Sequence, residues 1–244
     1  MNVFISFSGE GREKYAVKLL KIYSSLGLNC WYDRHELYLG DTLKDTIIEN
    51  GITKCDYCVL FINKTYLNRE WPCEEAKLFL DKYVHSQEQR IFPVLIDVTK
   101  EDVLNSKIKD ILKIKYQFLN DDTMLEYIAI QMLNCMLHVE IKNQKIKNLN
   151  DALQYYKRLS KRSHINIYNA LSILSCMPST DYKSRTAILI CLSSELRSSI
   201  HENLIDRLSS LLYNDIEINE QIYGIAEAIF IMRTIDISTI NMIR

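Results

Sequence analysis

Short apolar runs alternate with helical patterns along the first 140 residues, and this alternation restricts the fold more than any other feature. Several runs are apolar at every position, which is typical of strands buried on both faces of a parallel sheet that helices cover on each side. The predicted strands are Asn2–Phe7, Leu28–Tyr32, Tyr57–Ile62, Arg90–Ile96 and Ile114–Phe118. Helices are predicted at Arg12–Leu26, Thr42–Ile52 and Thr123–Val139. The sequence therefore predicts an α/β domain on a five-stranded parallel sheet.

The most informative helical segment follows the third strand, in the stretch F-I-N-K-T-Y-L-N-R-E-W-P-C-E-E-A-K-L-F at residues 61–79. Pro72 is predicted at the first helical position, where a backbone N–H would have no hydrogen-bond partner within the helix in any case. After it, apolar residues recur at i, i+3, i+4 and i+7, which predicts a stripe that faces the core. The stripe consists of Ala76, Phe79, Leu80 and Tyr83.

Two adjacent glutamates are predicted in the first turn of this helix. At about 100° per residue, Glu74 points nearly opposite the stripe, whereas Glu75 lies at its edge, one turn after Trp71. The helix dipole favours the ionised form of a carboxylate in the first turn. A carboxylate beside an aromatic wall suits the stabilisation of a cationic, sugar-like transition state. Glutamates at helix starts are also common without any such role, so both interpretations stay open at this point.

The composition changes near residue 140. Five of the six glycines lie before that point, and Lys142–Asn150 is polar and basic, like a linker or the start of a helix. Beyond it only helical periodicity is visible, with short breaks at Pro178–Asp181 and Asn214–Asp215 that indicate antiparallel helix pairs. We therefore predict two domains, an α/β domain at 1–140 and an all-helical domain at 141–244.

The charge and composition exclude several classes of partner. The formal net charge is −1, so no general attraction to nucleic acid or anionic membranes is expected. No run has the length of a membrane span, and no secretory leader pattern opens the chain. Seven cysteines with one closely spaced pair argue for a reducing compartment. We expect a cytoplasmic protein with no membrane partner and no nucleic-acid partner.

Two motifs that carry chemistry in other proteins are incomplete here. Two glycines follow the first strand as in a dinucleotide-binding fingerprint, and Asp33 ends the second strand where a ribose-binding acid would lie, but Lys14 occupies the third glycine position. Cys55 and Cys58 have the spacing of a metal or redox pair, yet no second pair or nearby histidine completes a ligand set. The sequence therefore predicts no metal site.

Four short segments, in order along the first 140 residues, resemble the sequence boxes of one known family. They are Val3–Glu10 (V-F-I-S-F-S-G-E), then Trp31–Asp33 with Leu37 and Gly40, then Asn63, Tyr66, Trp71 and Glu75, and finally Phe92–Val94. Each segment is a weak signal, but four in the right order are specific to the Toll/interleukin receptor (TIR) domain family. Two departures, Pro72 before Cys73 and Asn68 near the usual serine, leave the four-residue step from tryptophan to glutamate unchanged.

The resemblance implies a flavodoxin-like fold and one of two functions. Enzymatic members cleave the nicotinamide–ribose bond of NAD⁺ to give nicotinamide and ADP-ribose or a cyclic ADP-ribose-like signal. The glutamate at the position of Glu75 is catalytic in these members, and NAD⁺ is their substrate, with no separate cofactor. The alternative is a non-catalytic TIR–TIR adaptor, a class that commonly lacks this glutamate. Because this chain keeps both Glu75 and Trp71, we favour the enzyme.

The resemblance also implies roles for further residues. Those expected to bind substrate are Phe7, Ser8, Arg12, Asp33, Trp71 and Cys73. An assembly loop containing His35, Leu37, Tyr38 and Gly40 would close over the site or reach a neighbouring subunit in a homo-oligomer. Bacterial TIR enzymes commonly act in anti-phage defence, so the helical domain would serve as a sensor, an oligomerisation module or a docking surface for a second defence protein.

Overall fold

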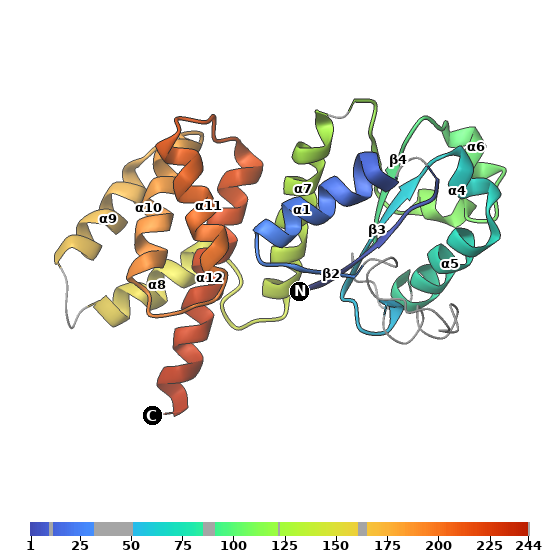
Figure 1. The fold of residues 1–244 in the computed structure, drawn as a ribbon. Coiled ribbons are helices and arrows are strands. Elements are labelled where there is room, and N and C mark those ends of the chain that lie inside the picture. Colours follow the sequence, from blue (N-terminus) through green and yellow to red (C-terminus); the bar gives the residue numbers. More distant parts are fainter. Residues whose placement is uncertain (10–11, 32–50, 85–90, 122, 161–164, 244) are drawn as a thin grey trace. The chain divides into compact units, whose positions relative to one another are not determined.

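The computed structural model describes residues 1–9, 12–31, 51–84, 91–121, 123–160 and 165–243 (Figure 1). The chain divides into two compact units, Met1–Met132 and Leu133–Arg244. The division falls inside helix α7 (Met124–Lys142), several residues before the predicted boundary. Most of the predicted helix Thr42–Ile52 lies outside the described residues.

Five parallel strands form the sheet of the first unit, in the order β2-β1-β3-β4-β5. They are β1 (Asn2–Ser6), β2 (Asn29–Trp31), β3 (Tyr57–Ile62), β4 (Ile91–Leu95) and β5 (Gln117–Phe118). The predicted α/β sheet is thereby confirmed, and β3 has its predicted bounds. The order 2-1-3-4-5 is that of flavodoxin-like folds, in which the direction of winding reverses between the first and third strands.

Helices cover both faces of this sheet. They are η1 (Arg12–Ala16), α1 (Val17–Ser25), α4 (Lys64–Asn68), α5 (Glu70–Val84), α6 (Lys100–Leu104), η3 (Lys109–Lys113) and the first part of α7. Every residue of β3 is buried, and successive residues face opposite layers. Leu60 belongs to the core beneath α5, whereas Phe61 stacks on Tyr15 of η1. Figure 1 shows α1 on one side of the sheet and α4, α5 and α6 on the other.

Helix α5 begins earlier than the sequence predicts. It starts at Glu70, so Pro72 is its third residue and the prediction that Pro72 opens the helix is wrong. Proline is tolerated there because the first four N–H groups of a helix have no partner within it. Glu74 and Glu75 consequently lie in the second turn, where the helix dipole acts more weakly than at the terminus. The predicted stripe from Ala76 to Tyr83 is buried.

The second unit is helical throughout its described residues, as the periodicity predicts. After the end of α7 it contains α8 (Leu149–Ser160), α9 (Ile165–Cys176), α10 (Tyr182–Glu195), α11 (Glu202–Tyr213) and α12 (Glu220–Ile243). Its core includes an edge-to-face pair between Tyr156 and Phe230, with ring centroids 5.6 Å apart. None of the helices described in either unit is both long and apolar enough to cross a membrane.

Replacing Phe79 with Ala should lower the free energy of unfolding of the first unit by about 3–5 kcal/mol. Phe79 is fully buried, and its ring centroid lies 5.0 Å from that of Phe4 and 5.7 Å from that of Tyr83. Both tryptophans of the chain, Trp31 and Trp71, lie in this unit, so tryptophan fluorescence during urea unfolding reports on it alone. The control Leu104→Ala removes a side chain that is 56% exposed and should change stability by less than about 0.5 kcal/mol.

Candidate functional site

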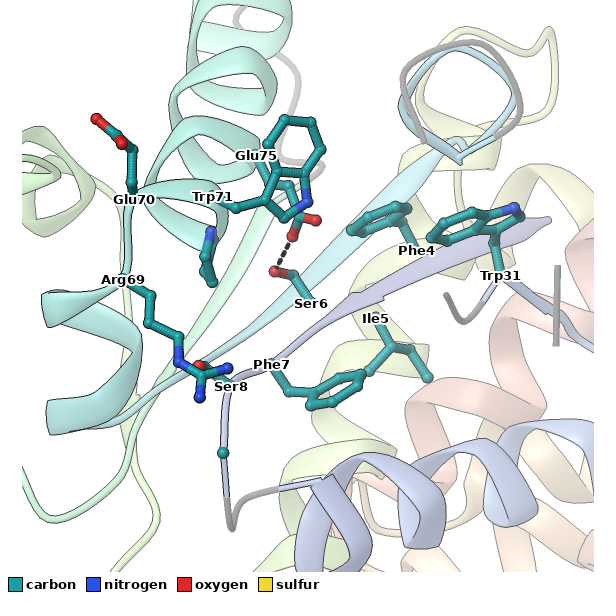
Figure 2. A pocket seen from close by; sticks show the side chains of 12 residues that line it. Phe4, Ile5, Ser6, Phe7, Ser8, Trp31, Arg69, Glu70, Trp71 and Glu75 are labelled. Carbon is teal, nitrogen blue, oxygen red and sulfur yellow. Dashed lines mark hydrogen bonds between the residues drawn. The ribbon is translucent and has the colours of Figure 1, made fainter. Parts of the chain in front are cut away.

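A cavity of about 470 Å³ lies at the carboxyl end of β1, beside the start of α5 (Figure 2). Its wall comprises Phe4–Gly9 from β1 and the turn after it, Trp31 from β2, Arg69 from the link between α4 and α5, and Glu70, Trp71, Pro72 and Glu75 from the start of α5. Open α/β sheets bind ligands outside the carboxyl ends of their strands, at the point where the winding reverses. The cavity occupies this position beside β1.

Glu75 is a buried carboxylate in the wall of this cavity, with only 7% of its surface exposed. Its Oε2 accepts a hydrogen bond of 2.6 Å from the Ser6 hydroxyl (Figure 2). The Ser6 Oγ also lies 2.9 Å from the hydroxyl of Tyr66, a fully buried residue of α4. Three side chains from β1, α4 and α5 therefore form one linear arrangement, Tyr66–Ser6–Glu75, which we call the hydroxyl chain.

The direction of these hydrogen bonds follows from proton availability. Burial, and then the negative charge of Glu75, raise the pKa of Tyr66 well above its ordinary value, although the hydrogen bond with Ser6 lowers it in part. Tyr66 therefore keeps its proton at neutral pH. Ser6 has a single proton, which it donates to Glu75. The hydrogen bond between the two hydroxyls is accordingly donated by Tyr66.

Asn63 connects the exit of β1 to the start of α4. Its Oδ1 accepts a hydrogen bond of 2.7 Å from the backbone N–H of Tyr66, which caps α4, and its amide group donates one of 3.1 Å to the Ser8 carbonyl. The turn beyond Ser8 requires glycine, because Gly9 has φ +64° and a Cβ there would lie 3.0 Å from the Thr65 methyl group. The cavity floor and the helix that carries Tyr66 are thus fixed to each other.

Aromatic side chains form much of the remaining wall. Trp71 and Glu75 are four residues apart on α5, so they lie on the same face of the helix, and both line the cavity. At the other side of Glu75, Phe4 stacks on Trp31 with ring centroids 4.8 Å apart and an angle of 7° between the rings. A planar, partly charged ligand would therefore meet a carboxylate between aromatic surfaces.

The structure brings some predicted site residues together and leaves others apart. Phe7, Ser8, Trp71 and Glu75 all line the cavity. Cys73 is absent from its lining; it is buried, and its thiol donates to the carbonyls of Tyr66 and Leu67 at 3.5 and 3.7 Å. At about 100° per residue, positions 73 and 75 lie about 200° apart around α5, so they cannot face the same space.

The remaining predicted site residues fall outside the description. Arg12 begins η1, but its side chain is not among those described. The other positions outside the described residues are Asp33, His35, Leu37, Tyr38 and Gly40.

Sequence reasoning missed several residues of the cavity wall, and Ser6 and Arg69 matter most among them. The sequence did contain a signal for Ser6, because this polar residue directly follows three apolar residues, Val3, Phe4 and Ile5, that are buried in the sheet. No sequence pattern indicated that Arg69 lines the cavity, because its position depends on the short link between α4 and α5. Within the described ranges, no group of three or more histidine, cysteine or acidic side chains could hold a metal ion.

Comparison with known proteins gives consistent matches to the first unit. The sequence model of the TIR domain matches residues 3–127. An NAD(+) hydrolase of Theionarchaea archaeon is 35% identical over 102 residues, which cover 42% of this chain and 30% of the relative. A 2' cyclic ADP-D-ribose synthase of Acinetobacter baumannii is 27% identical over 104 residues, covering 43% and 38%. The chain thus spans about a third of the length of these relatives, and the second unit lies outside the segment that the TIR domain model matches.

Replacing Asn63 with Ala should destabilise the first unit by about 1 kcal/mol, because the cap of α4 and the bond to the Ser8 carbonyl are both lost. The matched control is Asn68→Ala at the exposed end of the same helix, for which we expect little change. Urea unfolding followed by tryptophan fluorescence measures both variants. Equal stabilities of the two variants would contradict the capping role.

Proposed function

The chain belongs to the TIR domain family, and we propose that it cleaves the nicotinamide–ribose bond of NAD⁺ to yield nicotinamide and either ADP-ribose or a cyclic ADP-ribose-like product. The observation that carries the proposal is the buried Glu75 carboxylate in the cavity wall, held by Ser6 and flanked by Trp71. The names of the relatives, an NAD(+) hydrolase and a cyclic ADP-D-ribose synthase, support the same substrate.

The chemistry of this bond suits a site with one fixed carboxylate. Cleavage of a glycosidic bond passes through a state in which the ribose ring resembles an oxocarbenium ion. Nicotinamide leaves as a neutral molecule, so no general acid has to protonate it. A negative charge that is already in place beside the ribose stabilises the positive charge that develops there, and it does so more strongly because the Glu75 carboxylate is largely shielded from water. Glu75 is assigned this role.

Hydrolysis and cyclisation share this step and differ only in the acceptor of the ribose carbon. Water is the acceptor in hydrolysis, whereas a nucleophilic atom of the ADP-ribose portion is the acceptor in cyclisation. We therefore assign Glu75 to the common step and leave the product to experiment.

The charges along the cavity suggest how the dinucleotide lies in it. Glu75 and Trp71 form one end, and Figure 2 shows the Arg69 side chain extending towards the end formed by Ser8. Arg69 is the one basic side chain in the described lining. The Ser8 hydroxyl is buried and has no hydrogen-bond partner among the described residues. We propose that nicotinamide ribose binds at the Glu75 end and the pyrophosphate at the Ser8 and Arg69 end.

Replacing Glu75 with Gln should abolish NAD⁺ cleavage, lowering kcat by at least about a hundredfold, because the charge that stabilises the transition state is removed. The matched control is Glu74→Gln, since the neighbouring carboxylate does not line the cavity and should leave kcat unchanged. Chromatography of NAD⁺, nicotinamide, ADP-ribose and cyclic products measures both variants and identifies the product. Wild type and Glu75→Gln with equal, measurable turnover would refute the assignment.

The same assay should be run over a range of protein concentrations. The family resemblance leads us to propose that the protein self-associates through TIR–TIR contacts, in which case specific activity rises with concentration. No turnover at any concentration would favour an adaptor role over the enzyme.

Replacing Arg69 with Gln should raise KM for NAD⁺ about three- to tenfold with little change in kcat, because a charged hydrogen bond to the pyrophosphate is lost in both the ground and transition states. Lys64→Gln removes an exposed positive charge on α4 that lies outside the cavity lining and serves as the control. Steady-state kinetics at constant ionic strength separates the two parameters. A fall in kcat at unchanged KM would contradict this placement of the pyrophosphate.

A further inference from the structure

We propose that Ser6 and Tyr66 are positioning residues whose hydroxyl groups fix the orientation of the Glu75 carboxylate and maintain its charge. The proposal rests on the proposed function only for the consequence in catalysis, because the hydroxyl chain itself is a feature of the fold. Neither residue is expected to touch the reacting atoms. Both act through Glu75.

The first argument is the burial of all three groups. Ser6 is 2% exposed, Tyr66 is fully buried and Glu75 is 7% exposed. An ionised carboxylate removed from water is costly unless hydrogen-bond donors replace the lost solvation. The Ser6 hydroxyl supplies such a donor at 2.6 Å, a distance typical of a hydrogen bond to a charged acceptor. A hydrogen-bond donor to the charged form stabilises that form, so the Ser6 hydroxyl offsets part of the free-energy cost of burying the charge of Glu75.

The second argument is the direction of donation. A serine hydroxyl alone is a rotor that can turn its single proton towards any acceptor. Tyr66 removes this freedom, because it donates to the Ser6 oxygen and leaves the Ser6 proton for Glu75. Chains of hydrogen bonds also strengthen one another when water is excluded. Tyr66 therefore influences the carboxylate without contacting it.

The third argument is the rigidity of the elements that hold the two hydroxyls. Ser6 belongs to β1, the strand that pairs with both β2 and β3, and its Cα faces that of Leu60 in the register. Tyr66 is held by the Asn63 cap at the start of α4. A glutamate side chain has three torsions and would otherwise move by more than the roughly 1 Å that catalysis tolerates. The hydroxyl chain connects this flexible side chain to β1, an interior strand of the sheet.

The test uses the full chain with two substitutions, Ser6→Ala and Tyr66→Phe, and measures kcat and KM for NAD⁺ from pH 4 to 9. Ser6→Ala should lower kcat about tenfold or more at neutral pH and change KM by less than about twofold, as expected for one lost hydrogen bond to a charge that acts in the transition state. Tyr66→Phe should lower kcat less, by about threefold, because Tyr66 reaches Glu75 only through Ser6. In both variants the acid limb of the kcat profile should move to higher pH, since a carboxylate with a weaker donor takes up a proton more readily.

The described titratable groups around the Glu75 carboxylate include Tyr66 on α4, Cys58 on β3, and Arg69 and Glu70 in the cavity wall. Tyr66 and Cys58 both have a pKa raised above the ordinary value by burial and then by Glu75, so neither titrates in acid. The Oε1 of Glu70 lies 3.4 Å from the Nζ of Lys107, and the Glu70 side chain is exposed. The variant Glu70→Gln is included as the control for this second carboxylate of the cavity wall.

The matched control is Tyr23→Phe. Tyr23 is also fully buried, and its hydroxyl donates a hydrogen bond of 3.1 Å to the Ala129 carbonyl, away from the cavity. This variant loses a comparable hydrogen bond and should lose comparable stability, but its kcat and pH profile should match those of the wild type. Ser6→Thr keeps a hydroxyl at position 6 and should recover most of the activity lost in Ser6→Ala.

A second measurement does not depend on turnover. The carboxyl carbon of Glu75, labelled with ¹³C and assigned with Glu75→Gln, is titrated by NMR in the wild type, Ser6→Ala and Tyr66→Phe. The proposal requires that Glu75 titrates at higher pH in both variants than in the wild type. If the wild type shows no NADase activity, the proposed function fails, and this titration still decides the inference. An unchanged titration in both variants overturns it, as does a loss of kcat in Tyr23→Phe equal to that in Tyr66→Phe.

Discussion

A hydrogen bond of 2.6 Å from Ser6 to Glu75 joins β1, an interior strand of the sheet, to the helix that borders the cavity. It is the contact on which the candidate site depends, because it places a charged group where water is largely excluded and compensates it there. The surrounding structure supports this one contact. Tyr66 sets its direction, and Asn63 holds Tyr66 and the Ser8 carbonyl together.

The strand order explains why these groups can meet. In the order β2-β1-β3-β4-β5, the chain leaves β1 in one direction and β3 in the other, so a crevice opens beyond their carboxyl ends. Ser6 ends β1, and α4 and α5 follow β3. Residues nearly seventy positions apart therefore face one space. The ring of Phe4 lies between those of Trp31 and Phe79, which packs α5 onto the sheet and sets the width of this crevice.

Helical spacing explains why Trp71 and Glu75 line the cavity as predicted and why Cys73 does not. Trp71 and Glu75 are four residues apart, so any helix through this segment places them on one face, whatever its first residue. That is why the error at Pro72 did not displace the predicted site. Cys73 lies between them on the opposite side of the helix, where its thiol meets backbone carbonyls. The resemblance of this segment to the family therefore did not reveal which way the Cys73 side chain points.

The sequence by itself determined the parallel sheet, the helical second unit and the face of α5 that carries Glu75, because these depend on hydrophobic periodicity, which is local. Only the tertiary structure decided that Ser6 and Tyr66 form a hydroxyl chain with Glu75 and that Arg69 lines the cavity. These contacts involve residues of β1, of α4 and α5, and of the link between the two helices. Hydrophobic periodicity does not predict which strand end lies beside which helix. Their arrangement follows from the crossover order and the packing beneath α5.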